Sequence, residues 1–367
     1  DSGIKIPYNW RVKRLMNKKI KVLVGMSGGV DSSVSAALLV EQGYEVIGAF
    51  MKNWSRGVNK DEDEFVECGW KVERRDAARV AAKLGIPFVT FDFEEEYRAK
   101  VVENLFAESL IGRTPNPDVL CNKYIKFDRL MKEADRLECD FVATGHYART
   151  KDGQLLAGLD GNKDQTYFLW AIQPEVLSRV LFPIGDMEKP AVREKARELG
   201  LPVAEKKDST GICFVGEVNM REFLQERLPK DPGSIITIDG EVIGEHEGLA
   251  FYTIGQRHGL NVGGGTPWYV VKKRAQTKEL VVASNFHPSL YQSELEADQL
   301  NWFIEPKFPI KCLARIRYRQ ALQECVVESI GPDRIKATFP EPQRAVTSGQ
   351  SIVFYQDDVV LGGGIID

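Results

Sequence analysis

The chain has 367 residues, a formal net charge of −4, and hydrophobic and charged fractions that are ordinary for a soluble globular protein. This length exceeds one typical hydrophobic core, so we expect two or three domains. No apolar run approaches the length of a membrane span, and no apolar segment follows the basic N-terminus. Both features argue against a membrane-spanning or secreted protein.

Cysteine and histidine usage argues against a structural metal site. Six cysteines occur, none in a CxxC pair, and only four histidines are present. Sparse cysteines in a chain of this size indicate a reducing compartment. We therefore expect a cytoplasmic protein in which a functional cysteine is a reactive thiol, and we identify no protein ligands for a metal.

The acidic balance gives no overall attraction to nucleic acid, but the basic residues are clustered. Basic stretches without an acidic residue are Ser2–Val30, Lys272–Arg274 and Lys311–Arg319. Each run taken singly is more often a solvated face than a binding surface.

After residues 1–17, to which we assign no role, short apolar runs alternate with amphipathic stretches at helical spacing. The predicted strands are Lys21–Met26, Glu45–Met51, Pro87–Phe91 and Asp140–Thr144. The predicted helices are Val34–Gln42, Val72–Leu84, Glu94–Ile111 and Ile125–Leu137. This alternation favours an α/β fold with a doubly wound, mostly parallel, Rossmann-like sheet, in which ligands bind beyond the carboxyl ends of the strands.

The second half of the chain is predicted to be mainly β. A helix at Val192–Leu199 and a loop at Lys206–Glu217 precede one short helix, Met220–Leu228. The strand signals that follow are Ile235–Ile238, Glu241–Ile243, Trp268–Lys273, Leu280–Ala283, Leu313–Tyr318, Glu324–Ser329, Arg334–Phe339 and Ser351–Tyr355. Their spacing predicts a small antiparallel barrel at the C-terminus. We expect a catalytic domain at 18–217, a small mainly-β central domain at 218–290 and a C-terminal antiparallel β-barrel at 291–367.

A glycine loop, Ser27–Ser33 (SGGVDSS), joins the first strand to the first helix. Glycines allow a tight turn, and the free N–H groups at the helix start, with the serine hydroxyls, can bind an anion. The loop lacks the lysine of a Walker A motif and does not match GxGxxG. It resembles the pyrophosphate loop of the N-type ATP pyrophosphatases, which cleave ATP between its α and β phosphates. The alternative is a tight turn without a ligand.

Two cysteines have unusual surroundings. Cys121 follows a loop with two prolines and precedes a predicted helix, where the helix dipole lowers a thiol pKa. Lys123 could lower it further, and Asp118 could act as a general base. Cys213 lies in a loop rich in Ser, Thr and Gly, which allows close approach or movement. We expect the other cysteines to be buried and inert.

The motifs SGGVDSS, RTPNPDVLCNKYIKF, ATGHYAR, NKDQTYFL, KKDSTGICFVGE, FYTIGQRHGL, IRYRQ and GQSIVFY resemble, in this order, the bacterial tRNA-specific 2-thiouridylase family. The resemblance covers about Ile20 to Asp367. It implies an adenine nucleotide alpha hydrolase-like fold for the first domain and tRNA binding by the barrel.

The resemblance also implies site residues. For ATP these are Gly25, Met26, Ser27, Gly28, Gly29, Val30, Asp31, Ser32, Met51 and Gly145. The loop that contacts the target base is Asn116, Pro117 and Asp118. The other implied tRNA contacts are His146, Lys163, Asp164, Gln165, Arg317, Tyr318 and Gln350. Cys121 matches the family's nucleophile, and Cys213 matches the cysteine that carries the persulfide.

The implied reaction is 2-thiolation of the wobble uridine in a tRNA anticodon loop. AMP is transferred from ATP to the uracil C2 oxygen, and sulfur from the Cys213 persulfide then replaces it. Mg²⁺ would neutralise the phosphates. Cys121 would form a transient disulfide with Cys213, and a persulfide sulfur-donor protein would be a partner.

Two other classes stay open on the residues alone. One is an ATP pyrophosphatase ligase or amidotransferase that acts on a small molecule, which needs neither reactive cysteine nor a basic barrel. The other is a non-catalytic RNA-binding or nucleotide-sensing protein that has kept the glycine loop. The presence of both cysteine motifs argues against each of them.

Overall fold

A computed structural model describes residues 19–55, 69–207, 220–263, 265 and 267–367 of the chain. Residues 1–17, Cys68 and Cys213 lie outside the described residues. The chain divides into two compact units. The first contains Asp1–Val101, Asp118–Glu217 and Asp357–Val360, and the second contains Val102–Pro117, Val218–Gln356 and Leu361–Asp367.

The first unit is built on a parallel sheet with the strand order β3-β2-β1-β4-β7. Its strands are β1 (Lys21–Gly25), β2 (Glu45–Lys52), β3 (Phe88–Asp92), β4 (Phe141–Ala143) and β7 (Val180–Leu181). The chain runs outward from β1 to β3 and then returns to β4 on the other side of β1. The topological switch point therefore lies between β1 and β4, and the predicted doubly wound sheet is confirmed.

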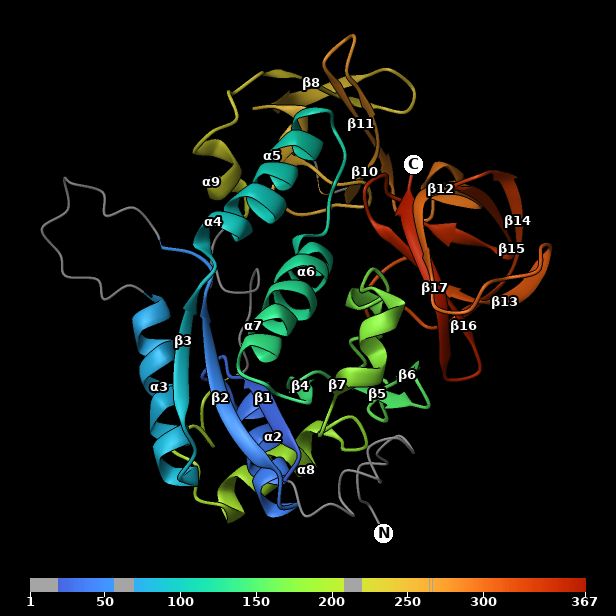
Figure 1. The fold of residues 1–367 in the computed structure, drawn as a ribbon. Coiled ribbons are helices and arrows are strands. Elements are labelled where there is room, and N and C mark those ends of the chain that lie inside the picture. Colours follow the sequence, from blue (N-terminus) through green and yellow to red (C-terminus); the bar gives the residue numbers. More distant parts are fainter. Residues whose placement is uncertain (1–18, 56–68, 208–219, 264, 266) are drawn as a thin grey trace, which may run out of the picture. The chain divides into compact units, whose positions relative to one another are not determined.

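Helices cover both faces of this sheet (Figure 1). The helices α2 (Val30–Glu41), α3 (Gly69–Leu84) and α8 (Lys189–Glu198) share one core cluster with Val22 and Val24 of β1. The opposite face carries a helical run whose segments are α6 (Pro117–Leu120), η2 (Cys121–Arg129) and α7 (Leu130–Arg136). A Cβ placed on Gly25 would lie 3.4 Å from Leu130 Cδ2, so this run packs against the end of β1.

Two helix predictions need correction. The stretch Glu94–Ile111 is not one uniform helix but α4 (Glu94–Tyr97), the π-helical η1 (Arg98–Val102) and α5 (Glu103–Leu110). The helix expected at Ile125–Leu137 begins earlier, because the helical run starts at Pro117. Proline suits a first helical position, since its missing N–H would have no partner there and its φ is already helical.

The first unit is completed by a β5 (Ala148–Lys151) and β6 (Gln154–Ala157) hairpin and by short 3₁₀ turns. The turns are η3 (Thr166–Phe168) and η4 (Pro174–Arg179). Val359 pairs with Leu156 of β6 within this unit.

The second unit contains a mixed sheet with the order β10-β11-β8-β9. Its strands are β8 (Gly233–Thr237), β9 (Val242–His246), β10 (Trp268–Arg274) and β11 (Glu279–Ser284), and the short turn η5 spans Leu249–Phe251. Helix α9 (Met220–Gln225) packs on α5 through Phe223 and Phe106, whose ring centroids are 5.5 Å apart.

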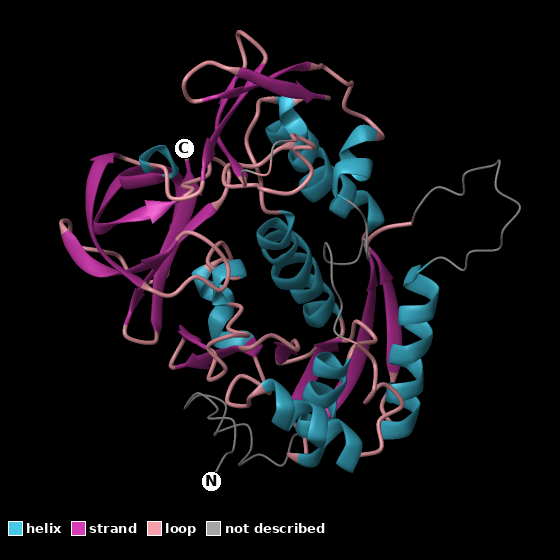
Figure 2. Cartoon of the chain, turned by 180° about the vertical axis from the view of Figure 1, so that it is seen from behind, coloured by secondary structure: helices cyan, strands magenta, loops and turns pink. Residues whose placement is uncertain are grey.

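The second unit also contains an antiparallel barrel, seen from behind in Figure 2. Its strands are β12 (Tyr291–Trp302), β13 (Ile310–Arg315), β14 (Gln323–Gly331), β15 (Arg334–Arg344), β16 (Ser351–Gln356) and β17 (Val359–Ile366), and η6 (Pro288–Leu290) precedes them. The order β12-β15-β14-β13-β16-β17 closes because β12 also pairs with β17. The predicted barrel is therefore confirmed.

Three details of the barrel differ from the prediction. We did not predict β12 or β17. Gly362–Gly364 hides the strand pattern of β17, although glycine is needed there: a Cβ on Gly362 would lie 2.3 Å from the Asn301 carbonyl oxygen. The strand predicted to reach Tyr318 ends at Arg315, so Arg317 and Tyr318 lie in the turn that follows.

Among all described helices, none is long and apolar enough to cross a membrane.

Candidate functional site

The glycine loop leaves the carboxyl end of β1 and forms a closed turn at the start of α2. Ser32 Oγ accepts a hydrogen bond from the Ser27 N–H at 3.2 Å, and Ser27 Oγ accepts one from the Gly29 N–H at 3.3 Å. Ser33 Oγ donates to the Gly29 carbonyl at 2.7 Å. These bonds hold the loop at a helix N-terminus, where the first backbone N–H groups and the helix dipole favour an anion.

Two glycines of the predicted ATP site have no room for a side chain. Gly28 has φ +77, and a Cβ there would lie 2.3 Å from the Glu73 carbonyl oxygen. A Cβ on Gly145, just after β4, would lie 2.6 Å from the Ser32 backbone nitrogen. The segment after β4 therefore approaches the start of α2 backbone to backbone, at the switch point where the strand order predicts ligand binding.

Met51, near the end of β2, is buried against the same place. Its Cε atom would lie 3.3 Å from a Cβ on Gly25, and its side chain is 3% exposed. The structure thus brings together the predicted ATP-binding residues Gly25–Ser32, Met51 and Gly145.

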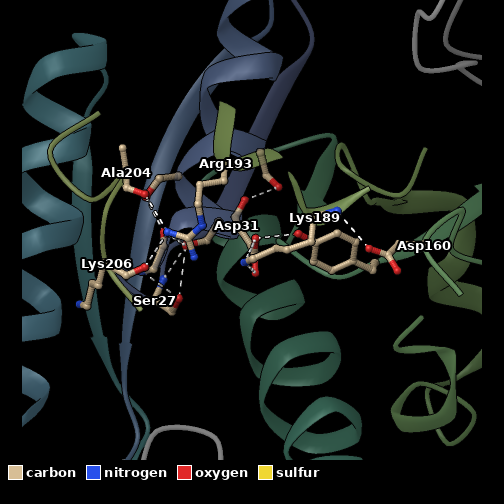
Figure 3. A network of polar contacts seen from close by, with 12 residues as sticks. Ser27, Asp31, Asp160, Lys189, Arg193, Ala204 and Lys206 are labelled. Atoms are coloured by element: carbon tan, nitrogen blue, oxygen red, sulfur yellow. Dashed lines mark hydrogen bonds and ion pairs between the residues drawn. The ribbon is translucent and has the colours of Figure 1, made fainter. Parts of the chain in front are cut away.

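Asp31 at the start of α2 is held by two residues that we did not predict (Figure 3). Lys189 Nζ lies 2.8 Å from Asp31 Oδ1 and 3.0 Å from Oδ2, and the Tyr147 hydroxyl donates to Oδ1 at 2.9 Å. Lys189 is 158 positions away in the sequence, so no local signal links it to the loop.

A second lysine, Lys206, lies near the glycine loop on the side away from Lys189 in Figure 3. Its ammonium donates to the Gly28 carbonyl at 3.1 Å and to Asp76 Oδ2 at 2.8 Å. Arg193 fixes the backbone around Lys206, because its Nη1 donates to the carbonyls of Ala204 at 2.8 Å and Lys206 at 3.0 Å. Lys206 belongs to the KKDSTGIC motif, but we assigned it no role from the sequence.

The structure contradicts the low thiol pKa that we expected for Cys121. It lies one turn inside the helical run that begins at Pro117, where the effect of the helix dipole has decayed, and it is fully buried. Burial raises the pKa of its thiol to about 12; Lys126 acts to lower this pKa and Asp118 to raise it. Lys126, rather than Lys123, is thus the cation that favours the thiolate.

We expect Cys121 of the free protein to resist alkylation. With a pKa of about 12, about one thiol in ten thousand is ionised at pH 8. Because the pKa is raised, the ionised fraction grows about tenfold for each pH unit up to that value. Iodoacetamide labelling followed by peptide mass spectrometry measures the rate, with the same peptide in the urea-unfolded chain as reference. Equal rates in the folded and unfolded chains would contradict this reading of the site.

His146 lies next to Cys121's helix and is buried, with 7% exposure. Its Nδ1 lies 2.7 Å from Thr144 Oγ1, and its Nε2 lies 3.3 Å from Lys126 Nζ. Burial, and to a smaller extent Lys126, holds its pKa well below the usual value, so the ring is neutral at pH 7. Its predicted contact with tRNA stays a prediction, and it requires a nucleotide to enter the protein.

The loop before Cys121 is divided between the two units. Thr114 belongs to the second unit, where its N–H donates to the Ser348 carbonyl at 2.9 Å and its carbonyl accepts from Gln350 Nε2 at 2.7 Å. Asn116 and Pro117 lie in the same unit, whereas Asp118 and Cys121 lie in the first. Gln350, predicted as a tRNA contact, thus has a part in holding this loop.

The predicted tRNA contacts at Lys163, Asp164 and Gln165 lie in a turn that two of them stabilise. Asp164 is 2% exposed, and its Oδ1 accepts from the Gly158 N–H at 3.1 Å and from the Thr166 hydroxyl at 2.8 Å. Gln165 Oε1 accepts from the Tyr147 N–H at 3.0 Å. A role of this turn in RNA binding stays a prediction.

Arg317 in the barrel unit also has internal partners. Its Nη2 donates to the Ile254 carbonyl at 2.8 Å, the Ala345 carbonyl at 3.0 Å and Thr347 Oγ1 at 2.9 Å. Arg319 in the same turn is exposed, and its guanidinium carbon lies 5.2 Å from the centroid of the Tyr318 ring. Arg319 is therefore better placed than Arg317 to meet a phosphate.

Among the residues that the structure describes, neither a metal-binding cluster nor a disulfide occurs. No group of three His, Cys, Asp or Glu side chains that could hold a metal ion converges in this part of the chain. The described cysteines, Cys121, Cys139, Cys312 and Cys325, are free thiols. Cys312 and Cys325 face each other across β13 and β14, with sulfur atoms 3.7 Å apart.

The fold and the glycine loop define an α/β protein of the HUP class that carries two further β modules. Three family models agree: the tRNA methyl transferase HUP domain matches residues 20–217, the tRNA methyl transferase PRC-barrel domain 221–284, and the aminomethyltransferase beta-barrel domain 292–366. Curated relatives then place the protein more narrowly. The chain belongs to the tRNA-specific 2-thiouridylase family, whose members are enzymes.

Three relatives show how close this relationship is. The tRNA-specific 2-thiouridylase MnmA of Tolumonas auensis is 51% identical, over 96% of this chain and 97% of that protein. The proteins of the same name from Marinomonas sp. and Listeria monocytogenes are each 50% identical over 96% of this chain, which is 92% and 95% of their own lengths. A solved complex of a 4-thiouridine synthetase with RNA and ATP is only distantly similar, at 18% identity and a TM-score of 0.36 over 56% of this chain and 50% of that chain.

Proposed function

We propose that this protein catalyses ATP-dependent 2-thiolation of the wobble uridine in tRNA, with AMP and pyrophosphate as the other products. The observation that carries the proposal is the 50% identity to tRNA-specific 2-thiouridylases over 96% of the chain. Within that span the chain has the glycine loop and both cysteine motifs.

ATP fits the loop at the switch point. Gly28 and Gly145 have no side chain that would cover the backbone of the loop. The N–H groups at the start of α2 suit phosphates, and the buried Met51 lies near the end of the neighbouring strand β2. Mg²⁺ would be held largely by the phosphates of ATP, because it commonly takes only one or two protein carboxylates in such sites. Asp31 is the carboxylate on the loop itself, and it is now paired with Lys189.

The first chemical step is activation of the uracil. The C2 carbonyl is a poor electrophile, and its oxygen is a poor leaving group. Attack of this oxygen on the α phosphorus of ATP forms a C2–O–AMP bond and releases pyrophosphate, which the glycine loop receives. The oxygen can then leave as part of AMP.

The second step replaces that oxygen by sulfur. The outer sulfur of a Cys213 persulfide attacks C2 and AMP leaves, which links Cys213 to the base through a disulfide. The Cys121 thiolate then attacks the Cys213 sulfur, so that 2-thiouridine departs and a Cys121–Cys213 disulfide forms. In the other route, Cys121 first frees the outer sulfur as sulfide. Both routes need an external reductant, and Lys126 favours the Cys121 thiolate in each.

The substrate determines the partners. The wobble base must leave the anticodon loop to enter a buried site, and RNA loops are recognised through unstacked bases and phosphates. We propose that Asn116, Pro117 and Asp118 contact the base, and that His146, Lys163–Gln165, Arg317, Tyr318 and Gln350 are further tRNA contacts. We also propose a cytoplasmic enzyme with catalytic, central and barrel domains at 18–217, 218–290 and 291–367, which a persulfide donor protein supplies with sulfur.

We expect Arg319→Ala to weaken tRNA binding and to lower the slope of log affinity against log salt by about 1, because one phosphate contact is lost. Its melting temperature should equal that of the wild type, since the side chain is exposed. Arg317→Ala should weaken binding and also lower the melting temperature, because it removes three internal hydrogen bonds. Filter binding over a salt series and thermal denaturation check both variants. An affinity for tRNA that does not depend on salt would contradict the basic barrel surface.

The proposed function is tested by incubation with bulk tRNA, ATP, Mg²⁺ and a labelled sulfur donor, followed by nucleoside analysis. We expect labelled 2-thiouridine at the wobble position and stoichiometric AMP. If ATP were cleaved only in the presence of a small-molecule acceptor, and no thionucleoside formed, the small-molecule ligase would be favoured instead.

A further inference from the structure

The glycine loop lacks a lysine of its own, yet its ligand is strongly anionic. A Walker A loop places a lysine within the loop, where it reaches the β and γ phosphates. In this chain Ser27–Ser33 contains no basic residue. The N-terminal end of a helix supplies only about half a positive charge, so a protein cation close to the loop would add to what the helix and Mg²⁺ provide for a triphosphate.

The tertiary structure brings two lysines to this loop, and they differ in how they are held. Lys189 is bound to both oxygens of Asp31. Lys206 instead donates to the Gly28 carbonyl and to one oxygen of Asp76. An ammonium has three N–H donors, and no described residue accepts from the third one of Lys206.

Access and neighbouring charge also favour Lys206. Its side chain is 30% exposed, so an anion on the loop can reach the ammonium. Asp76 is its carboxylate partner, and Glu73 supplies the backbone oxygen that crowds Gly28. Burial raises the pKa of Glu73, which Lys206 in turn acts to lower. Without Lys206, a phosphate at Gly28 would lose the cation that links this loop to Asp76 and that offsets the charge of Glu73.

We infer that Lys206 binds the phosphates of ATP that leave as pyrophosphate, and so replaces the lysine that the loop lacks. This inference rests on the proposed function, because it requires that the loop bind ATP. Lys206 makes its strongest contact when negative charge builds up on the departing pyrophosphate. The ammonium therefore favours both ATP binding and the adenylation step.

The test is binding of ATP, inorganic pyrophosphate and AMP, measured by calorimetry with the full chain in the presence of Mg²⁺. We expect Lys206→Met to weaken binding of ATP and pyrophosphate about ten- to hundredfold and to leave AMP binding within about twofold. Lys206→Arg should recover part of the loss, because it keeps the charge. Lys207→Met is the matched control, since Lys207 is the next residue and carries the same charge on an exposed side chain. It should bind all three ligands as the wild type does.

A purely structural role of Lys206 makes a different prediction. If Lys206 only tied Gly28 to Asp76, Asp76→Asn would weaken all three ligands as much as Lys206→Met does, and that result would overturn the inference. We expect Asp76→Asn to keep its affinity for pyrophosphate, because the lysine remains. Wild-type affinity in Lys206→Met would also overturn the inference, while leaving the proposed function intact. If the wild-type chain bound neither ATP nor pyrophosphate, the proposed function would fail and the inference with it.

Discussion

We expect Cys121→Ser and Cys213→Ser each to abolish formation of 2-thiouridine while ATP and tRNA binding stay within about twofold of the wild type. The physical reason is that a hydroxyl can neither carry sulfane sulfur nor form the disulfide that releases the product. Serine is only slightly smaller than cysteine, so the Cys121→Ser variant should still fold although this side chain is fully buried. Nucleoside analysis after a single turnover measures the product.

Cys139→Ser is the matched control for Cys121→Ser. Cys139 is also a buried thiol of the first unit, and burial raises its pKa to about 11. It has no part in the proposed chemistry, so this variant should keep full activity. Normal thiolation by either Cys121→Ser or Cys213→Ser would rule out the proposed sulfur transfer.

We expect Gly28→Ala to lower ATP affinity by a factor of at least about ten and to lower thermal stability. The new methyl group would lie 2.3 Å from the Glu73 carbonyl oxygen, which belongs to the backbone of α3 and cannot rotate away. The loop must therefore shift, and the N–H groups that suit phosphate shift with it. The left-handed φ adds about 1–2 kcal/mol of strain for a residue with a Cβ. Calorimetric titration and thermal melting measure the two effects.

Gly43→Ala separates this clash from backbone strain. Gly43 has a similar φ of +83, but no atom lies within 4 Å of a Cβ placed there. This variant should lose about 1 kcal/mol of stability and keep the ATP affinity of the wild type. Equal loss of ATP affinity in the two variants would show that the fit of Gly28 against α3 does not matter for binding.

Local patterns predicted most of the first unit because its signals are short-range. The run Lys21–Met26, the glycine loop and the amphipathic helix after it each depend on neighbours in the sequence, and the structure has β1, the loop and α2 there. The helix begins at Val30 rather than at the predicted Val34, because the hydroxyls of Ser32 and Ser33 donate to the Gly29 carbonyl and stabilise the first turn. Strand β17 escaped prediction because its glycines are required by β12, a partner about sixty residues earlier in the chain.

The same limit applies to the candidate site. Motif resemblance indicated Cys121 as a nucleophile, but the expected low pKa was wrong, because the position of the helix start and the burial of the thiol depend on packing against the sheet. Residues predicted as tRNA contacts, such as Asp164 and Arg317, have internal hydrogen bonds that no sequence pattern reveals.

By itself, the sequence determined the strand–loop–helix unit at Ser27–Ser33, the parallel α/β class, the C-terminal barrel and the family to which the chain belongs. These follow from residue order, since turn chemistry and hydrophobic period act over a few positions. Only the tertiary structure decided which cations serve the loop, because Lys189 and Lys206 are separated from it by 158 and 178 positions. It also decided the ionisation of Cys121, because desolvation depends on what packs around a group rather than on its sequence neighbours.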